Sequence, residues 1–207
     1  MIDTAFLISA FVTLFVIIDP IGLAPLFVAL TQGMTTLERR RIAVRACLIS
    51  LGILALFAAF GEAVLGFIGI SMPAFRIAGG VLLFLTALDM LFERRTKRRE
   101  DQTGNEEDSD DPSVFPLAIP LIAGPGSIAS VILLTGQTPG LVGFSIVLGI
   151  AASVLVLVFL MFLAAGFMER GLGKTGITVI TRLLGMLLAA LSVQFVLDGL
   201  RDYGLGG

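Results

Sequence analysis

Six long apolar runs constrain this sequence more than any other feature, because each is long enough to cross a lipid bilayer. A bilayer core of about 30 Å needs about 20 apolar residues at the helical rise of about 1.5 Å per residue. Backbone amides in hydrocarbon must pair within their own segment, so continuous runs of this length predict α-helices and not open strands. The expected spans are Phe6–Leu30, Ala43–Leu65, Pro73–Phe92, Val114–Thr135, Leu141–Phe167 and Thr178–Leu200.

The composition favours the same class, an all-α integral membrane protein. Apolar residues make up 57% of the 207 residues and charged residues 14%, whereas a soluble domain carries about 45–50% and about 25%. The chain has no histidine and a single cysteine, Cys47, which removes the commonest catalytic base and any cysteine metal cluster. We therefore expect no enzyme activity, no catalytic residue, no metal site and no cofactor. A net charge of −2 also argues against nucleic acid as a partner.

Positive charges gather in alternate gaps between the expected spans. Four arginines lie within 39–45, a second group lies in 93–113, and a third follows the fifth span. The positive-inside rule then places these gaps in the cytoplasm and both termini on the non-cytoplasmic side. Residues 93–113 join a basic block to an acidic block, which predicts a charged cytoplasmic linker. The N-terminal segment carries Asp3 and no cation, so we do not expect a cleaved signal peptide.

The whole chain, 1–207, is expected to form one membrane domain made of two similar halves. Repeat 1 covers about 4–92 and repeat 2 about 114–200, with the charged linker between them. Each half holds three spans. Because three is an odd number, the second half must be inverted relative to the first, and inverted repeats of this kind are typical of transporters.

Two pairs of motifs support the repeat. Pro20 and Pro25 of the first span recur 100 positions later as Pro120 and Pro125 of the fourth. The third and sixth spans both begin with Arg-x-x-Gly and end with an acidic residue. Chance similarity between apolar segments is the alternative, but it does not account for two matched motif pairs.

Proline and glycine interrupt the first and fourth spans. Proline lacks an N–H and its ring clashes with the preceding turn, so two prolines with a glycine predict a short unwound stretch. The freed helix N-terminus suits a carboxylate, and the freed carbonyls suit an ammonium group or a small cation. Structural kinks are the alternative. The candidate substrate-binding residues are Asp19, Pro20, Gly22 and Pro25 in the first span, Pro120, Gly124, Pro125, Gly126 and Ser127 in the fourth, and Gln194 in the sixth.

Asp19 is the acidic residue that lies deepest in an expected span. It is about 14 residues, or about 21 Å, from the start of its span, and ionisable groups at such depth mark functional sites by default. It is therefore the first candidate for coupling transport to a proton or sodium ion. Asp19 could equally cap the helix that begins at Pro20. Gln194 could bond across helices or contact a substrate.

These motifs resemble those of the MarC family of multi-pass bacterial inner-membrane proteins. The matching segments are Asp19-Pro20-x-Gly22-x-x-Pro25, Ile119–Gly126, Phe75–Gly80 and Arg182–Gly185 with Gln194 and Gly199. The resemblance implies six spans in two inverted three-helix repeats. It also implies a relation to transporters of small neutral amino acids such as glycine and alanine.

The leading hypothesis is a secondary transporter of small neutral amino acids in the bacterial inner membrane, with its site between the breaks of the first and fourth spans. The chain has no Walker motif, so ATP is not the expected direct energy source. An exporter of drugs or other small metabolites and a non-transporting membrane protein are the alternatives. Expected partners are the substrate and the bilayer. Formation of a homo-oligomer is left open, since Gly136, Gly140 and Gly143 allow close helix approach without identifying an interface.

Overall fold

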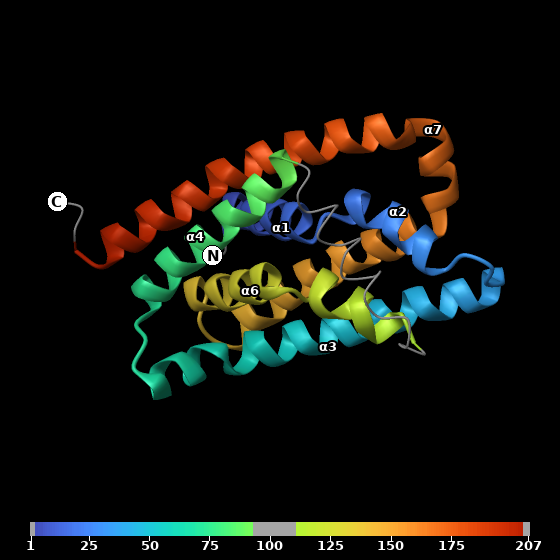
Figure 1. Cartoon of the computed structure of the whole chain (residues 1–207). Coiled ribbons are helices and arrows are strands. Elements are labelled where there is room, and N and C mark those ends of the chain that lie inside the picture. Colours follow the sequence, from blue (N-terminus) through green and yellow to red (C-terminus); the bar gives the residue numbers. More distant parts are fainter. Residues whose placement is uncertain (1–2, 93–110, 205–207) are drawn as a thin grey trace.

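A computed structural model describes residues 3–92 and 111–204, and all regular elements in these two stretches are helices. Side chains are described throughout these stretches except at 168–170, 172 and 174. Most of the predicted charged linker, 93–110, lies outside the described residues. The elements in Figure 1 are α1 (Thr4–Ile18), α2 (Pro20–Leu30), α3 (Thr36–Ile68), α4 (Met72–Leu91), η1 (Ser113–Ile122), α6 (Pro125–Gln137) and α7 (Leu141–Asp202).

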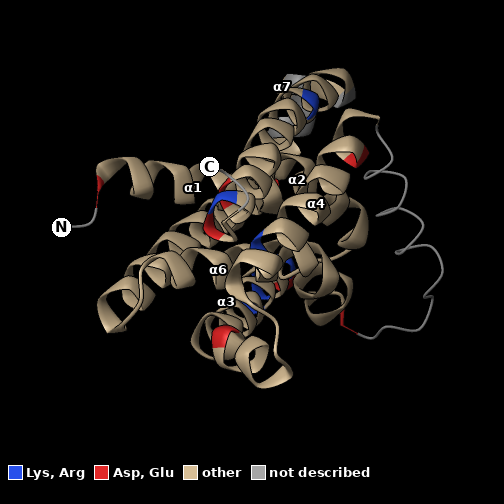
Figure 2. Ribbon diagram, turned by 90° about the vertical axis from the view of Figure 1, so that its left-hand side faces the viewer, with Lys and Arg blue, Asp and Glu red and all other residues tan. Residues whose placement is uncertain are grey.

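Five helical segments are long and apolar enough to cross a membrane. They are Thr4–Leu30, Thr36–Ile68, Met72–Leu91, Leu141–Phe167 and Thr175–Asp202. The number becomes six if η1 and α6, which bend by 56° at their junction, together form one span. The described residues thus form an all-helical, multi-pass membrane protein, and most of the ribbon carries no charged side chain (Figure 2).

Helix α3 begins at Thr36, seven positions before the predicted start at Ala43. A reciprocal cap explains the difference. The Thr35 hydroxyl accepts from the Glu38 N–H at 3.3 Å, and the Glu38 carboxyl accepts from the Thr35 N–H at 2.7 Å. Such a capping box stabilises the first turn without any apolar burial, so the helix extends through the arginine-rich segment that hydropathy assigns to a loop.

The predicted fifth and sixth spans belong to one long element, α7. Between the two predicted spans the chain leaves the helical conformation only at Gly173, with φ 61° and ψ 174°. A positive φ is accessible to glycine at little cost. The chain changes direction within α7, and the last part of this element returns beside α4 (Figure 1).

Two apolar clusters hold the helices together. One joins α1, α2, α3, η1, α6 and the first part of α7, and the other joins α1, α4, α6 and the last part of α7. Helices α1 and α6 contribute to both clusters, so they lie at the centre of the packing. Large apolar side chains such as Phe60, Phe67 and Leu163 remain exposed on the outside, as expected for a surface that faces lipid.

Two ion pairs join distant segments at opposite ends of the helical bundle. Arg45, near the start of α3, pairs with Asp111, which precedes η1. Arg76, on the helix that follows the end of α3, pairs with Asp202 at the end of α7. The first pair brings the first polar gap and the end of the 93–113 segment to the same end of the bundle.

Candidate functional site

Asp19 forms the junction between α1 and α2. Its backbone is left-handed (φ 57°, ψ 64°) and the residue is completely buried. Its carboxyl oxygen Oδ1 accepts from the backbone N–H of Gly22 at 3.0 Å, which makes Asp19 the N-cap of α2. Aspartate is one of the few residues that tolerate this conformation, because its short side chain bonds locally. The capping role considered from the sequence is therefore present in the fold.

Gly22 is required by the way that Asp19 caps the helix. A Cβ at position 22 would lie 2.1 Å from the Asp19 carboxyl oxygen Oδ2, well inside contact distance. Only glycine therefore lets the acidic side chain fold over the first turn of α2. The sequence motif Asp-Pro-x-Gly thus encodes one local structure.

The first interruption is narrower than the sequence predicts. Pro20 occupies the first position of α2, and the helix continues without a break through Pro25 to Leu30. The expectation of an unwound stretch that includes both prolines was therefore too broad, since only Asp19 leaves the helical conformation. Pro20 has no N–H to give to the Val16 carbonyl four residues earlier, so this junction frees one acceptor in a buried place.

The second interruption is longer and differently built. Phe115 and Ile119 have extended backbone angles inside η1, each before a proline joined by a cis peptide bond. Gly124 then precedes Pro125, the first residue of α6. A Cβ at Gly124 would lie 2.3 Å from the Pro120 carbonyl oxygen, so this turn also requires glycine.

The N-terminus of α6 has no side-chain cap, unlike that of α2. The Ser127 hydroxyl is buried near this end, but it donates to the Ile122 carbonyl at 2.8 Å and does not accept from the first turn. Pro125 itself has no N–H. The N–H groups of the first turn, including that of Gly126, therefore keep the partial positive charge of a helix N-terminus without a local side chain to meet it.

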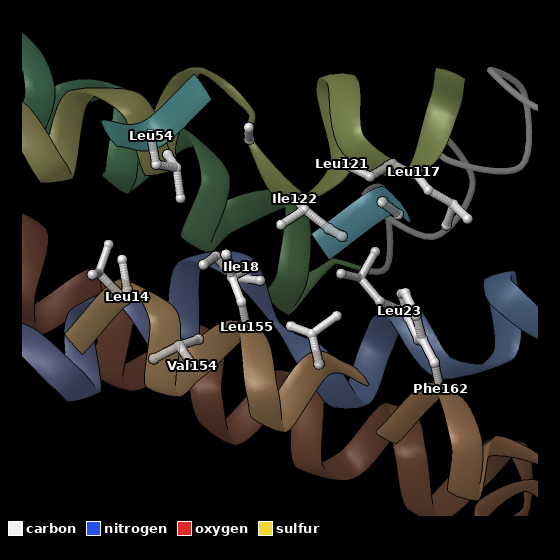
Figure 3. Packing of buried hydrophobic residues seen from close by; sticks show 14 of the residues in the cluster. Leu14, Ile18, Leu23, Leu54, Leu117, Leu121, Ile122, Val154, Leu155 and Phe162 are labelled. Atoms are coloured by element: carbon white, nitrogen blue, oxygen red, sulfur yellow. The ribbon is translucent and has the colours of Figure 1, made fainter. Parts of the chain in front are cut away.

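The fold brings the two interruptions together, although they are about 100 positions apart in sequence. A Cβ at Gly126 would lie 3.2 Å from Ile17 Cγ2, on α1 two residues before Asp19. Figure 3 shows Ile18 and Leu23, which flank the first junction, across the core from Ile122 in η1. The candidate residues of the first and fourth spans therefore lie in one region of the molecule. Asp19, Pro20, Gly124 and Ser127 are buried there, whereas Pro125 is exposed.

Gln194 lies outside the region of the two interruptions. Its side chain is exposed on α7 and donates to Asp198, one turn further along the same helix, at 2.8 Å. Two residues without a sequence motif, Thr13 on α1 and Ser130 on α6, carry buried hydroxyls and lie six positions from Asp19 and Gly124 respectively. Isolated threonine or serine within an apolar run was the available signal.

Comparison with known proteins gives the same family that the motifs resemble. The family model described as "MarC family integral membrane protein" matches residues 4–203. The chain belongs to the MarC family. No solved structure matches it.

Curated MarC-family relatives cover nearly the whole chain. The "UPF0056 membrane protein YvbG" of Bacillus subtilis is 38% identical over 200 residues, which are 95% of each chain. A "UPF0056 membrane protein" of the archaeon Archaeoglobus fulgidus is 37% identical over 199 residues, 96% of this chain and 93% of the relative. The "UPF0056 inner membrane protein YhgN" of Escherichia coli is 34% identical over 200 residues, 97% and 98% of the two chains. The family is thus shared by bacteria and archaea.

Proposed function

We propose that this protein is a secondary transporter of small neutral amino acids, of the glycine or alanine type, across the inner membrane. The observation that carries the proposal is the proximity, through Ile17 and Gly126, of two unlike helix junctions. One supplies the Asp19 carboxyl group, and the other supplies an uncapped helix N-terminus.

A zwitterion fits the chemistry of these two junctions. The uncapped first turn of α6 offers N–H donors and a positive dipole end to an α-carboxylate. The Asp19 carboxyl group and the carbonyl released by Pro20 offer acceptors to an α-ammonium group.

The packing of α4 against the last part of α7 supports two inverted halves. A Cβ at Gly80 of α4 would lie 2.8 Å from the Ser192 carbonyl oxygen, and one at Gly185 of α7 would lie 3.3 Å from the Ala87 carbonyl oxygen. Each glycine belongs to, or directly follows, the Arg-x-x-Gly motif of its half. The two helices therefore approach each other at neighbouring positions of the two motifs, which is compatible with a twofold relation between repeats.

We further propose that the arginine-rich end of α3 faces the cytoplasm and that both termini lie on the other side. The positive-inside rule supports this orientation. The Arg45–Asp111 pair agrees with it, because it gathers the first gap and the end of the 93–113 segment at one end. Transport would draw on an ion gradient, and the chain would carry out no chemical reaction.

The test is uptake of radiolabelled glycine and alanine by proteoliposomes that contain the purified protein. We expect substrate accumulation under an imposed proton or sodium gradient and its near-complete loss in Asp19→Asn. Asp3→Asn is the matched control, because Asp3 also caps a helix, accepting from the Ala5 N–H at 3.2 Å, but is exposed. Wild-type uptake by Asp19→Asn would exclude a role for this residue. Transport of drugs or other metabolites with no amino-acid uptake would favour an exporter.

A further inference from the structure

Hydroxyl side chains inside the helices of this protein usually donate to their own backbone. Thr31 donates to the Phe27 carbonyl at 2.7 Å, Ser50 to Ala46 at 2.8 Å, and Thr135 to Val131 at 2.8 Å. This local bond is the ordinary way for serine and threonine to satisfy their donor in apolar surroundings.

Thr13 and Ser130 depart from this pattern. Thr13 is 1% exposed and Ser130 is completely buried. Neither side-chain oxygen has a hydrogen-bond partner among the described residues. A buried polar group without a partner costs free energy, and each of these two could have been replaced by an apolar residue of similar shape. Their presence points to a ligand that is bound during the working cycle.

The two hydroxyls lie on α1 and α6, two helices that pack against each other. Thr13 lies one helical turn before Ile17, and Ser130 lies one turn after Gly126. Residues four apart share a helix face, and Ile17 and Gly126 are in contact, as described above. Beyond Gly126, Leu133 of α6 packs in the same apolar cluster as Ile17. The interface between α1 and α6 therefore carries one unpartnered hydroxyl from each helix.

We propose that Thr13 and Ser130 contribute ligands to a sodium-ion site between α1 and α6, next to the substrate region. Hydroxyl oxygens are neutral, hard ligands of the kind that such a cation prefers. Asp19, six residues after Thr13 on the same span, supplies a nearby carboxyl group that offsets the charge of a buried cation. The description of this ion as the coupling ion rests on the proposed transport function, whereas the cation site itself does not.

The experiment measures thermal unfolding of the purified full-length protein while sodium chloride replaces choline chloride at constant ionic strength. Binding to the folded state raises its apparent stability, so we expect a sodium-dependent rise for the wild type and a smaller response to potassium. Thr13→Val and Ser130→Ala should raise the sodium concentration for half-maximal stabilisation at least about tenfold, since even indirect partners of a metal ligand are worth about 10–100-fold in affinity. In choline alone, both variants should unfold at or above the wild-type temperature, because each removes an unsatisfied buried group.

Ser50→Ala is the matched control, because Ser50 is also completely buried but bonds to its own helix. Its sodium response should equal that of the wild type. The inference is overturned if sodium does not stabilise the wild type specifically, or if Thr13→Val and Ser130→Ala keep the full response. It is also overturned if the two variants lose stabilisation by glycine and not by sodium, since the hydroxyls would then bind substrate. Sodium binding without amino-acid uptake would contradict the proposed transport and leave the cation site supported.

Discussion

The two helix interruptions are related by position but are built from different parts. Between α1 and α2, a single left-handed residue, Asp19, turns the chain and caps the next helix with its own carboxyl group. Extended residues interrupt η1 itself, the chain then bends by 56° between η1 and α6, and no side chain caps the following helix. The first junction contributes a carboxyl group to the centre of the molecule, and the second contributes open backbone donors.

This difference teaches that two similar halves need not supply the same chemistry. A site made of two acidic caps would repel a carboxylate, and one made of two open N-termini would repel an ammonium group. One junction of each kind distinguishes the two ends of a zwitterion. The asymmetry between the two junctions, an acidic cap at one and an uncapped helix N-terminus at the other, is therefore the feature that a substrate site would use.

The largest effect should come from Gly124→Ala. Its new methyl group would lie 2.3 Å from the Pro120 carbonyl oxygen, a backbone atom that moves only if η1 moves. We expect the free energy of unfolding to fall by about 1–3 kcal/mol, the usual cost of overpacking. Thermal unfolding in detergent measures it. Gly149→Ala is the control, because nothing lies within 4 Å of its added Cβ, and its stability should equal or exceed that of the wild type. A wild-type unfolding temperature for Gly124→Ala would show that the second junction is adaptable.

An intermediate effect should come from removal of the cap at the first junction. Asp19→Ala deletes the acceptor for the Gly22 N–H and should lower stability by about 1 kcal/mol, as for other N-cap deletions. Asp19→Asn keeps a side-chain oxygen at this place and should retain most of that stability while it loses uptake. Equal unfolding temperatures for the wild type and Asp19→Ala would contradict the capping role. The pair of variants thus separates capping from transport.

The smallest effect should come from Asp111, which precedes the second junction at the surface. Hydrogen bonds from the Ser113 hydroxyl and N–H, with the charge of Arg45, hold the pKa of Asp111 below its usual range despite partial burial. A group with a lowered folded-state pKa adds stability above its unfolded pKa of about 3.9 and loses it as the pH falls through the lower value. Asp111→Asn should therefore flatten the acid limb of the stability–pH profile slightly, and less so at high salt. Identical acid limbs for the wild type and Asp111→Asn would show that Asp111 does not stabilise the fold.

The membrane-spanning class could be predicted well, because span length and apolar composition are local properties. The predicted span Leu141–Phe167 coincides with an observed segment, and four others differ mainly at their ends. The predicted fourth span, Val114–Thr135, corresponds to the bent pair of η1 and α6. Hydropathy does not show that the chain between the fifth and sixth spans is helical on both sides of Gly173, since a polar segment can be helical when the helices next to it continue into it. The early start of α3 depended on a cap between Thr35 and Glu38 that hydropathy does not register.

For the candidate site, the motifs located both junctions but not their extent. Proline disfavours a helix, yet α2 accommodates Pro25, because neighbouring groups can satisfy the freed carbonyl in a packed membrane protein. Gln194 appeared equivalent to the other candidates in sequence, and its exposure on α7 separates it from them. Thr13 and Ser130 belong to no sequence motif. Their proposed role in cation binding depends on their lack of a hydrogen-bond partner among the described residues, which only the structure shows.

By itself, the sequence determined that the chain is a multi-pass helical membrane protein and where proline and glycine interrupt its helices. These properties follow from the chemistry of short segments in hydrocarbon. Only the tertiary structure decided that Ile17 meets Gly126, that the Asp19 side chain turns back onto its own helix, and that the start of α6 is uncapped. The first of these contacts joins residues about 100 positions apart and depends on how whole helices pack, and the other two depend on backbone conformation at the junctions.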